Sequence, residues 1–148
     1  MARRSRMKNY KQTHVETINV GSSGGQVLVG YFQPIDVEGS NMSAYLHNVN
    51  LSCLLNDSPE GEIGGFIAYL TTGGSWDESD VITARAGNFA DTISLSCKRR
   101  IKSSVYEQDR NDGVVALWVE ISDITVGADV ELRLVAESWG RFLRFIPQ

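Results

Sequence analysis

The sequence is poor in the residues that usually carry catalytic or metal chemistry. Its 148 residues include two histidines, His14 and His47, and two cysteines, Cys53 and Cys97. Neither cysteine has a second cysteine or histidine at the close spacing of a zinc half-site. A glycosidase-type pair of carboxylates needs to converge only in space, so the sequence leaves that possibility open. We expect no catalytic residue, no metal site and no cofactor, and we predict that the protein is not an enzyme.

Long apolar runs are also missing. No run approaches the ~18 residues of a membrane-spanning helix, and the first residues lack the apolar stretch of a signal peptide. Two cysteines are too few for a disulfide-stapled scaffold, so we expect both to be free, buried thiols. Apolar residues make up 42% of the chain and charged residues 22%, which is ordinary for one globular domain.

No segment shows the apolar period of a helix, and several segments show the two-residue period of a strand instead. Between Gly113 and Trp139, two segments alternate apolar and other residues, as strands with one buried face do. The same alternation appears between residues 91 and 103. We predict that these faces lie in the core, with the buried residues Ile93, Leu95, Val115, Leu117, Val119, Leu132 and Leu134.

The remaining segments fit the same pattern. Strands are expected near residues 14–20, 26–33, 43–55, 63–72, 81–84, 91–103, 115–122, 130–135 and 142–147. Turn residues recur about every 10 positions, which is typical of an antiparallel sandwich or barrel. The fold class predicted is therefore all-β, an eight- to nine-stranded antiparallel sandwich. In residues 43–55 the alternation predicts one inward face, formed by Tyr45, His47, Val49, Leu51, Cys53 and Leu55. His47 is therefore predicted to be a core residue.

Charge is unevenly distributed along the chain. The net charge is −4, yet five cations lie in the first eleven residues, namely Arg3, Arg4, Arg6, Lys8 and Lys11. No basic residue follows until Arg85. Because the glycine-rich segment 21–25 leads into a strand and not into a helix, it is interpreted as a hinge and not as a phosphate-binding loop. We predict a basic arm with its hinge over residues 1–22 and a β-sandwich domain over residues 23–148.

Two further segments are candidate contact sites. A basic patch closes the outward face of the strand near residues 91–103, with Lys98, Arg100 and Lys102. An acidic loop carries Trp76, Asp77 and Glu78, and its tryptophan either anchors a partner or folds back onto the body. The basic segments contain no interleaved aromatic residues. Any nucleic-acid contact is therefore expected to be independent of sequence and free of base stacking.

A short basic arm, a glycine hinge and about eight strands with long loops resemble the single jelly-roll capsid proteins of viruses. The resemblance implies two four-stranded sheets, many copies in a symmetric shell, and an arm that faces the particle interior. It also implies a virion protein, made in the host cytoplasm, with other copies of itself and other capsid proteins as partners. Genomic nucleic acid or an inner membrane surface is a further expected partner, whereas a small-molecule substrate is not.

Five cations are fewer than the strongly arginine-rich arms of that family carry, which favours a role in subunit contacts or at a membrane surface. The alternative is a lectin-like sandwich that binds carbohydrate or protein through the loop with Trp76. The two readings differ in assembly, because a shell subunit forms large particles and a lectin stays a monomer or dimer.

Overall fold

The computed structural model describes residues 9–20, 25–34, 42–55, 64–103, 114–122 and 130–148. Within these residues the chain forms nine strands and one short 3-10 helix. In chain order they are β1 (Asn9–Val20), β2 (Val27–Pro34), β3 (Met42–Leu55), β4 (Gly65–Thr72), η1 (Glu78–Asp80), β5 (Val81–Gly87), β6 (Thr92–Ser103), β7 (Val115–Ser122), β8 (Val130–Arg141) and β9 (Leu143–Pro147).

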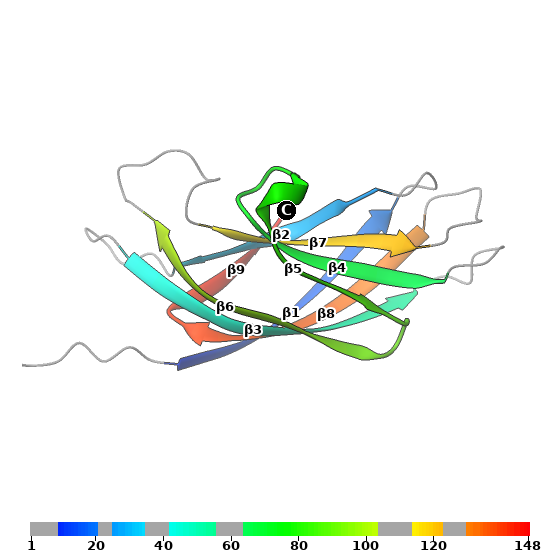
Figure 1. Cartoon of the computed structure of the whole chain (residues 1–148). Helices are drawn as coiled ribbons and strands as arrows, with labels where there is room; N and C mark the ends of the chain where they lie inside the picture. The colour runs from blue at the N-terminus through cyan, green and yellow to red at the C-terminus, as the bar shows by residue number, and fades with distance from the viewer. Residues whose placement is uncertain (1–8, 21–24, 35–41, 56–63, 104–113, 123–129) are drawn as a thin grey trace, which may run out of the picture.

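The strands form two antiparallel sheets that pack face to face (Figure 1). The first sheet has the order β1-β8-β3-β6 and the second has the order β5-β4-β7-β2-β9. Strands β1 to β4 pair in turn with β8, β7, β6 and β5, and successive pairs fall in opposite sheets. This is a long hairpin wrapped around a shared core, the arrangement of a jelly roll. The predicted antiparallel sandwich is confirmed, and β9 extends its second sheet beside β2.

The core lies between the two sheets. Alternate residues of each strand point into it, because successive side chains leave opposite faces of a pleated strand. The seven core residues predicted from residues 91–103 and 113–139 are all buried, which confirms the strand periods there: Ile93, Leu95, Val115, Leu117, Val119, Leu132 and Leu134. Phe32 and Phe66 add the largest fully buried side chains.

Strand β3 contains a bulge that overturns part of its predicted face. Against β8, residue Leu46 pairs with Gly140 and Asn48 pairs with Trp139, so His47 is an extra residue. An extra residue reverses the alternation beyond it. Leu46 and Val49 therefore both point inward, and His47 is exposed. The prediction that Tyr45 and His47 face the core is wrong for this reason, whereas Val49, Leu51 and Cys53 are buried as predicted.

Strand β1 begins well before the predicted boundary of the sandwich. Residues 9–20 pair with β8 along their whole length, from Asn9 opposite Arg141 to Val20 opposite Val130. The prediction that residues 1–22 form an arm and hinge outside the sandwich is therefore wrong for residues 9–20. The inward side chains near the start of β1 are polar and only partly buried, so they carry no clear apolar period. Residues 1–8 and 21–24 lie outside the described residues.

Both cysteines are free. Cys53 is buried in β3, and Cys97 is partly buried in β6. Burial raises the pKa of the Cys53 thiol to about 12 and that of the Cys97 thiol to about 11. Both thiols are free as predicted, but only Cys53 is fully buried, so the expectation of burial is confirmed for Cys53 and only in part for Cys97. In the described part of the chain, no helix is long and apolar enough to cross a membrane.

Candidate functional site

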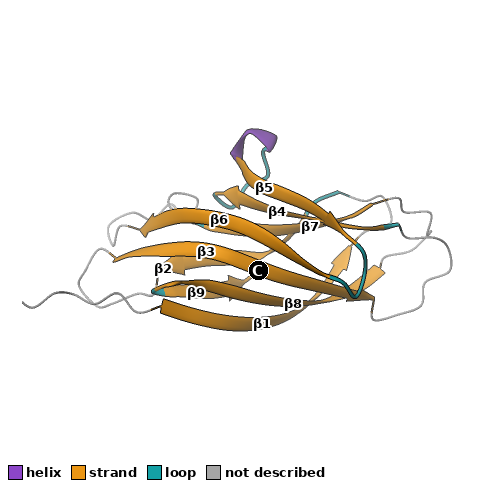
Figure 2. Ribbon diagram, turned by 60° about the horizontal axis from the view of Figure 1, so that its bottom comes forward, coloured by secondary structure: helices purple, strands orange, loops and turns teal. Residues whose placement is uncertain are grey.

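Figure 2 shows β6, β3, β8 and β1 side by side as one layer of the sandwich. The strand register places cations and aromatic rings at one end of the outward face of this sheet. Residues paired across an antiparallel sheet project from the same face, about 5 Å apart. One row runs Asn9–Arg141–Tyr45–Arg100 across the four strands. The next row along the sheet runs Lys11–Trp139–Asn48–Ser96. Aromatic and cationic side chains are therefore neighbours, although they come from strands far apart in the sequence.

Direct contacts link these side chains. The Nζ of Lys11 lies 5.3 Å from the centre of the Trp139 ring, and the guanidinium carbon of Arg141 lies 5.0 Å from that of Tyr45. Both distances are within the range of cation–π interactions. The ring of His47 meets the ring of Tyr45 edge-on, with 4.5 Å between their centres. Two cations and three aromatic side chains thus form one connected surface.

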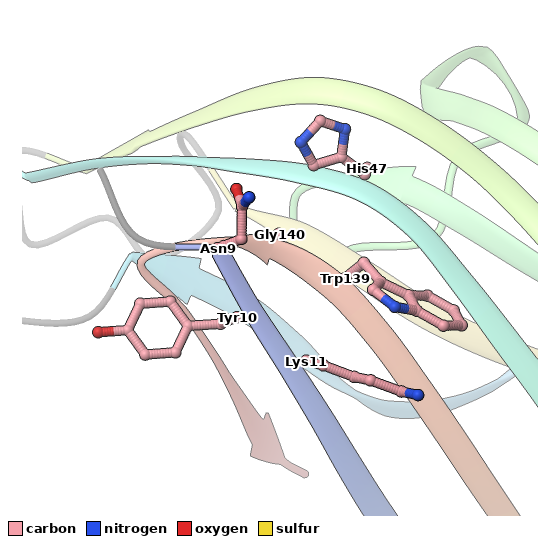
Figure 3. A pocket seen from close by; sticks show the side chains of 6 residues that line it. All are labelled: Asn9, Tyr10, Lys11, His47, Trp139 and Gly140. Carbon is pink, nitrogen blue, oxygen red and sulfur yellow. The ribbon is translucent and has the colours of Figure 1, made fainter. Parts of the chain in front are cut away.

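A pocket of about 310 Å³ opens on this surface, lined by Asn9, Tyr10, Lys11, His47, Trp139 and Gly140. Figure 3 shows that Lys11 extends alongside Trp139, whereas Tyr10 points away from it on the other side of β1. Gly140 has no side chain to fill the space between the strands. A Cβ at this position would collide with the side chain of Leu143 and with the carbonyl oxygen of Tyr45. The close approach of β8 to β3 therefore requires glycine here.

Bulges in two strands shape this end of the sheet. His47 faces outward only because of the bulge in β3. In β6, Lys98 has a φ of 48°, and the register against β3 shifts at the same place. Bulges re-aim side chains and are frequent beside functional sites. Here the bulge in β3 turns His47 to the side that already carries Trp139 and Arg141.

The fold brings together two basic segments that are far apart in the sequence. Lys11 was assigned to the arm and Lys98, Arg100 and Lys102 to a patch on a strand. Lys11, Lys98 and Arg100 lie at the same end of one sheet, and Lys102 is paired with Ser43 there, although its side chain is not described. We define the basic end of the sandwich as five cations that the described strands place there, namely Lys11, Lys98, Arg99, Arg100 and Arg141. Arg3, Arg4, Arg6 and Lys8 lie outside the described residues.

The aromatic members of this site were missed by the sequence analysis. Tyr45 and Trp139 belong to β3 and β8, which are distant in the chain, and no local pattern connects them. In the sequence, the only sign of Trp139 is that the apolar alternation is interrupted at residues 139–141. Register is decided by pairing between distant strands, and this is why the cluster emerges only in the folded sheet.

The acidic loop lies elsewhere, on the outward face of the second sheet. Trp76 packs edge-on against Tyr69 and Trp118, at 4.8 and 5.5 Å between ring centres. The Nε1 of Trp118 donates a hydrogen bond to Oγ1 of Thr71 (2.8 Å). Trp76 thus folds back onto the body, one of the two outcomes that the sequence left open.

Beside this aromatic cluster, the carboxylate of Asp77 in the acidic loop is exposed. Asp77 accepts hydrogen bonds from the backbone N–H and the hydroxyl of Ser79, and these bonds lower the pKa of its carboxyl group. Glu78 is exposed as well. The prediction that Trp76, Asp77 and Glu78 together contact a partner stays a prediction.

A second polar contact on this face involves Tyr69, whose hydroxyl donates to Oε1 of Glu120 at 2.6 Å. Burial, followed by this hydrogen bond, raises the pKa of Tyr69 to about 12. Because its pKa is raised, this tyrosine stays protonated at neutral pH. It stabilises the sheet and cannot act as a general base. Within the described residues, no three His, Cys, Asp or Glu side chains converge as a metal site would require.

No family model and no curated protein sequence matches the chain. The solved structures with which it aligns include three virus particles. They are the infectious bursal disease virus Gx strain (14% identity, TM-score 0.27, 97% of this chain and 42% of that chain), nora virus (12%, 0.26, 93% and 65%) and the VP2 subviral particle of infectious bursal disease virus (12%, 0.28, 97% and 43%).

The chain spans less than two thirds of the length of each of these proteins. The likeness is architectural only. TM-scores of this size do not establish a common fold, so the jelly-roll assignment rests on the strand order described above.

Proposed function

We propose that the protein is a structural virion protein, a subunit that assembles in many copies into a symmetric shell with its basic end toward the interior. The main support for this proposal is the position in the sheet at which β1 begins. Asn9, its first residue, lies in the same row as Arg141 and Arg100. The four cations that precede Asn9 in the sequence are therefore joined to the sandwich at its basic end.

This gives the subunit one end suited to a polyanion. Lys11, Lys98, Arg99 and Arg100 are exposed there, and the whole chain is nevertheless acidic. Cations held on one end of an acidic body orient the molecule toward an anionic surface, because their attraction is local and the body is repelled. A shell subunit needs this polarity, with one side facing the enclosed polyanion and the others facing neighbouring copies. The partners proposed are other copies of the chain and other capsid proteins.

The lectin-like alternative has less support from the geometry. Its ligand loop was expected to present Trp76, but this side chain packs against Tyr69 and Trp118. A carbohydrate site would need a free aromatic face together with hydrogen-bonding side chains in one pocket. The loop instead uses its aromatic ring to cover the second sheet.

The oligomeric state of the purified chain tests this proposal. Size-exclusion chromatography with light scattering at rising protein concentration should show large, discrete assemblies that dissociate on dilution or at high salt. A monomer or dimer of constant mass at every concentration would contradict the shell proposal and favour the lectin-like alternative. Negative-stain microscopy of the same fractions then separates closed particles from amorphous aggregates.

A further inference from the structure

We propose that the pocket at the basic end binds single-stranded nucleic acid, with a base stacked on Trp139 and phosphates held by Lys11, Arg100 and Arg141. This goes beyond the proposed function, because a shell subunit can assemble without such a site. It also differs from the contact expected of the basic arm, which involves charge alone.

The position of Trp139 is the first argument. Its register partners, Lys11 and Asn48, are on the outward face, so the ring has no place in the core. The neighbouring outward side chains of this sheet are polar and bonded to one another: Asn48 donates to Ser94 at 2.9 Å and to Asn50 at 3.0 Å. The half-buried Trp139 ring lines the pocket with Lys11 over it, and it becomes available to a planar ligand when Lys11 turns from the ring to a phosphate. Stacking of bases on such rings is how proteins bind single strands with little sequence preference.

The cations around the ring are the second argument. Arg141 and Arg100 flank Tyr45 in one row, and Lys11 lies over Trp139 in the next. The described strands place one carboxylate beside them, that of Glu137, which pairs with Lys11 at 3.5 Å. Lys11, Arg100 and Arg141 on this face therefore outweigh one acid, and the excess is complementary to phosphates. Glu137 and a phosphate compete for Lys11, so binding should weaken at high salt.

The combination selects the ligand. A sugar could stack on the aromatic ring, but it would leave the excess positive charge unpaired. An acidic segment of a second copy could pair with the cations, but it would make no contact that needs the ring. A duplex offers phosphates, but its bases are stacked inside and unavailable to Trp139. A single strand offers both an anionic backbone and free base faces.

Binding of a fluorescein-labelled (dT)15 to the full chain, measured by fluorescence anisotropy at low salt, tests the stacking. Trp139→Leu should weaken binding about 5- to 150-fold, the equivalent of ~1–3 kcal/mol for one stacked base. Trp139→Phe keeps an aromatic face and should restore most of the affinity. Wild-type tryptophan fluorescence should be quenched on binding, and the quench should disappear in Trp139→Phe. Unchanged affinity in Trp139→Leu, or equal affinity for a duplex, would overturn the proposal.

A matched pair of arginine variants tests the charge. Arg100 and Arg133 are both exposed on this sheet, but Arg133 lies toward its far end, opposite Thr17. Arg100→Ala should lower the salt dependence of binding by about 0.7 in the slope of log K against log salt, the value for one phosphate contact with a single strand. Arg133→Ala should leave the slope unchanged. Equal effects of the two variants would show nonspecific attraction and would contradict the site.

The arm is present in every variant, so its contribution cancels in these comparisons. The proposed function fails separately, since the assembly of the same samples is measured without nucleic acid. If the chain stays monomeric but binds the strand through Trp139, the shell proposal falls and the site stands. If particles form but Trp139→Leu binds like the wild type, the site falls and the shell proposal stands.

Discussion

His14 lies on the inward side of β1, where its ring is 4.6 Å from that of Phe145 and 6.2 Å from that of Phe32. Its Nε2 is 3.4 Å from the hydroxyl of Ser138. Burial lowers the pKa of His14, because the charged imidazolium loses hydration among these groups. At the scale of single residues, the environment set by packing thus makes this histidine a neutral, structural side chain.

His14 should make stability depend on pH. In the unfolded chain its pKa is the ordinary one, about 6.5, so the unfolded state takes up a proton first as the pH falls. The free energy of unfolding should therefore decrease as the pH drops below about 6.5. His14→Gln removes this titration, and its urea unfolding curves between pH 7 and pH 5 should show a smaller decrease than the wild type. Equal decreases in the two proteins would contradict the buried, neutral histidine.

Leu117 tests the core at the same scale. It is fully buried in β7, and Leu117→Ala should lower the free energy of unfolding by about 2–5 kcal/mol, because the cavity left behind is only partly filled. Val15 is the control, since it is 50% exposed on the outward side of β1. Val15→Ala should change stability by less than about 0.5 kcal/mol. A cost below 0.5 kcal/mol for Leu117→Ala would mean that this face is not a packed core.

At the scale of elements, strands are predicted well from the sequence where one face is fully buried in the core. β7 and β8 alternate cleanly, because Leu117 and Leu132 must be apolar to lie between the sheets. β1 was placed too late, because Gln12 and His14 on its inward side are polar and do not mark a buried face. The bulge at His47 was also beyond prediction, since it depends on how β3 pairs with β8 and β6.

Two truncations should separate β1 from the residues before it. Deleting residues 2–8 leaves the whole of β1 in place, so the melting temperature should change by less than about 2 °C. Deleting residues 2–14 removes half of β1, including the hydrogen bond from Gln12 to the carbonyl of Leu143 and the packing of His14. The longer deletion should destabilise the fold strongly in thermal unfolding followed by circular dichroism. Equal melting temperatures for the two truncations would mean that the first half of β1 is dispensable.

At the scale of the whole molecule, function follows from which strands meet. Wrapping a hairpin into two sheets brings β1, β8, β3 and β6 side by side (Figure 2). The register of these strands places their cations at one end. The charge asymmetry was visible in the sequence, but the aromatic rings beside it were not, because Tyr45 and Trp139 become neighbours only through β3 and β8. The expectation of a purely electrostatic contact was drawn from sequence neighbours alone.

Cryo-electron microscopy of the assembled protein tests the proposed shell subunit most directly. We expect closed, symmetric particles in which the basic end of every subunit, marked by Lys11, Arg100 and Arg141, lines the interior surface. Particles with this end on the outer surface would contradict the proposed orientation. A sample that contains only monomers or dimers under all conditions of concentration and salt would contradict the shell subunit itself.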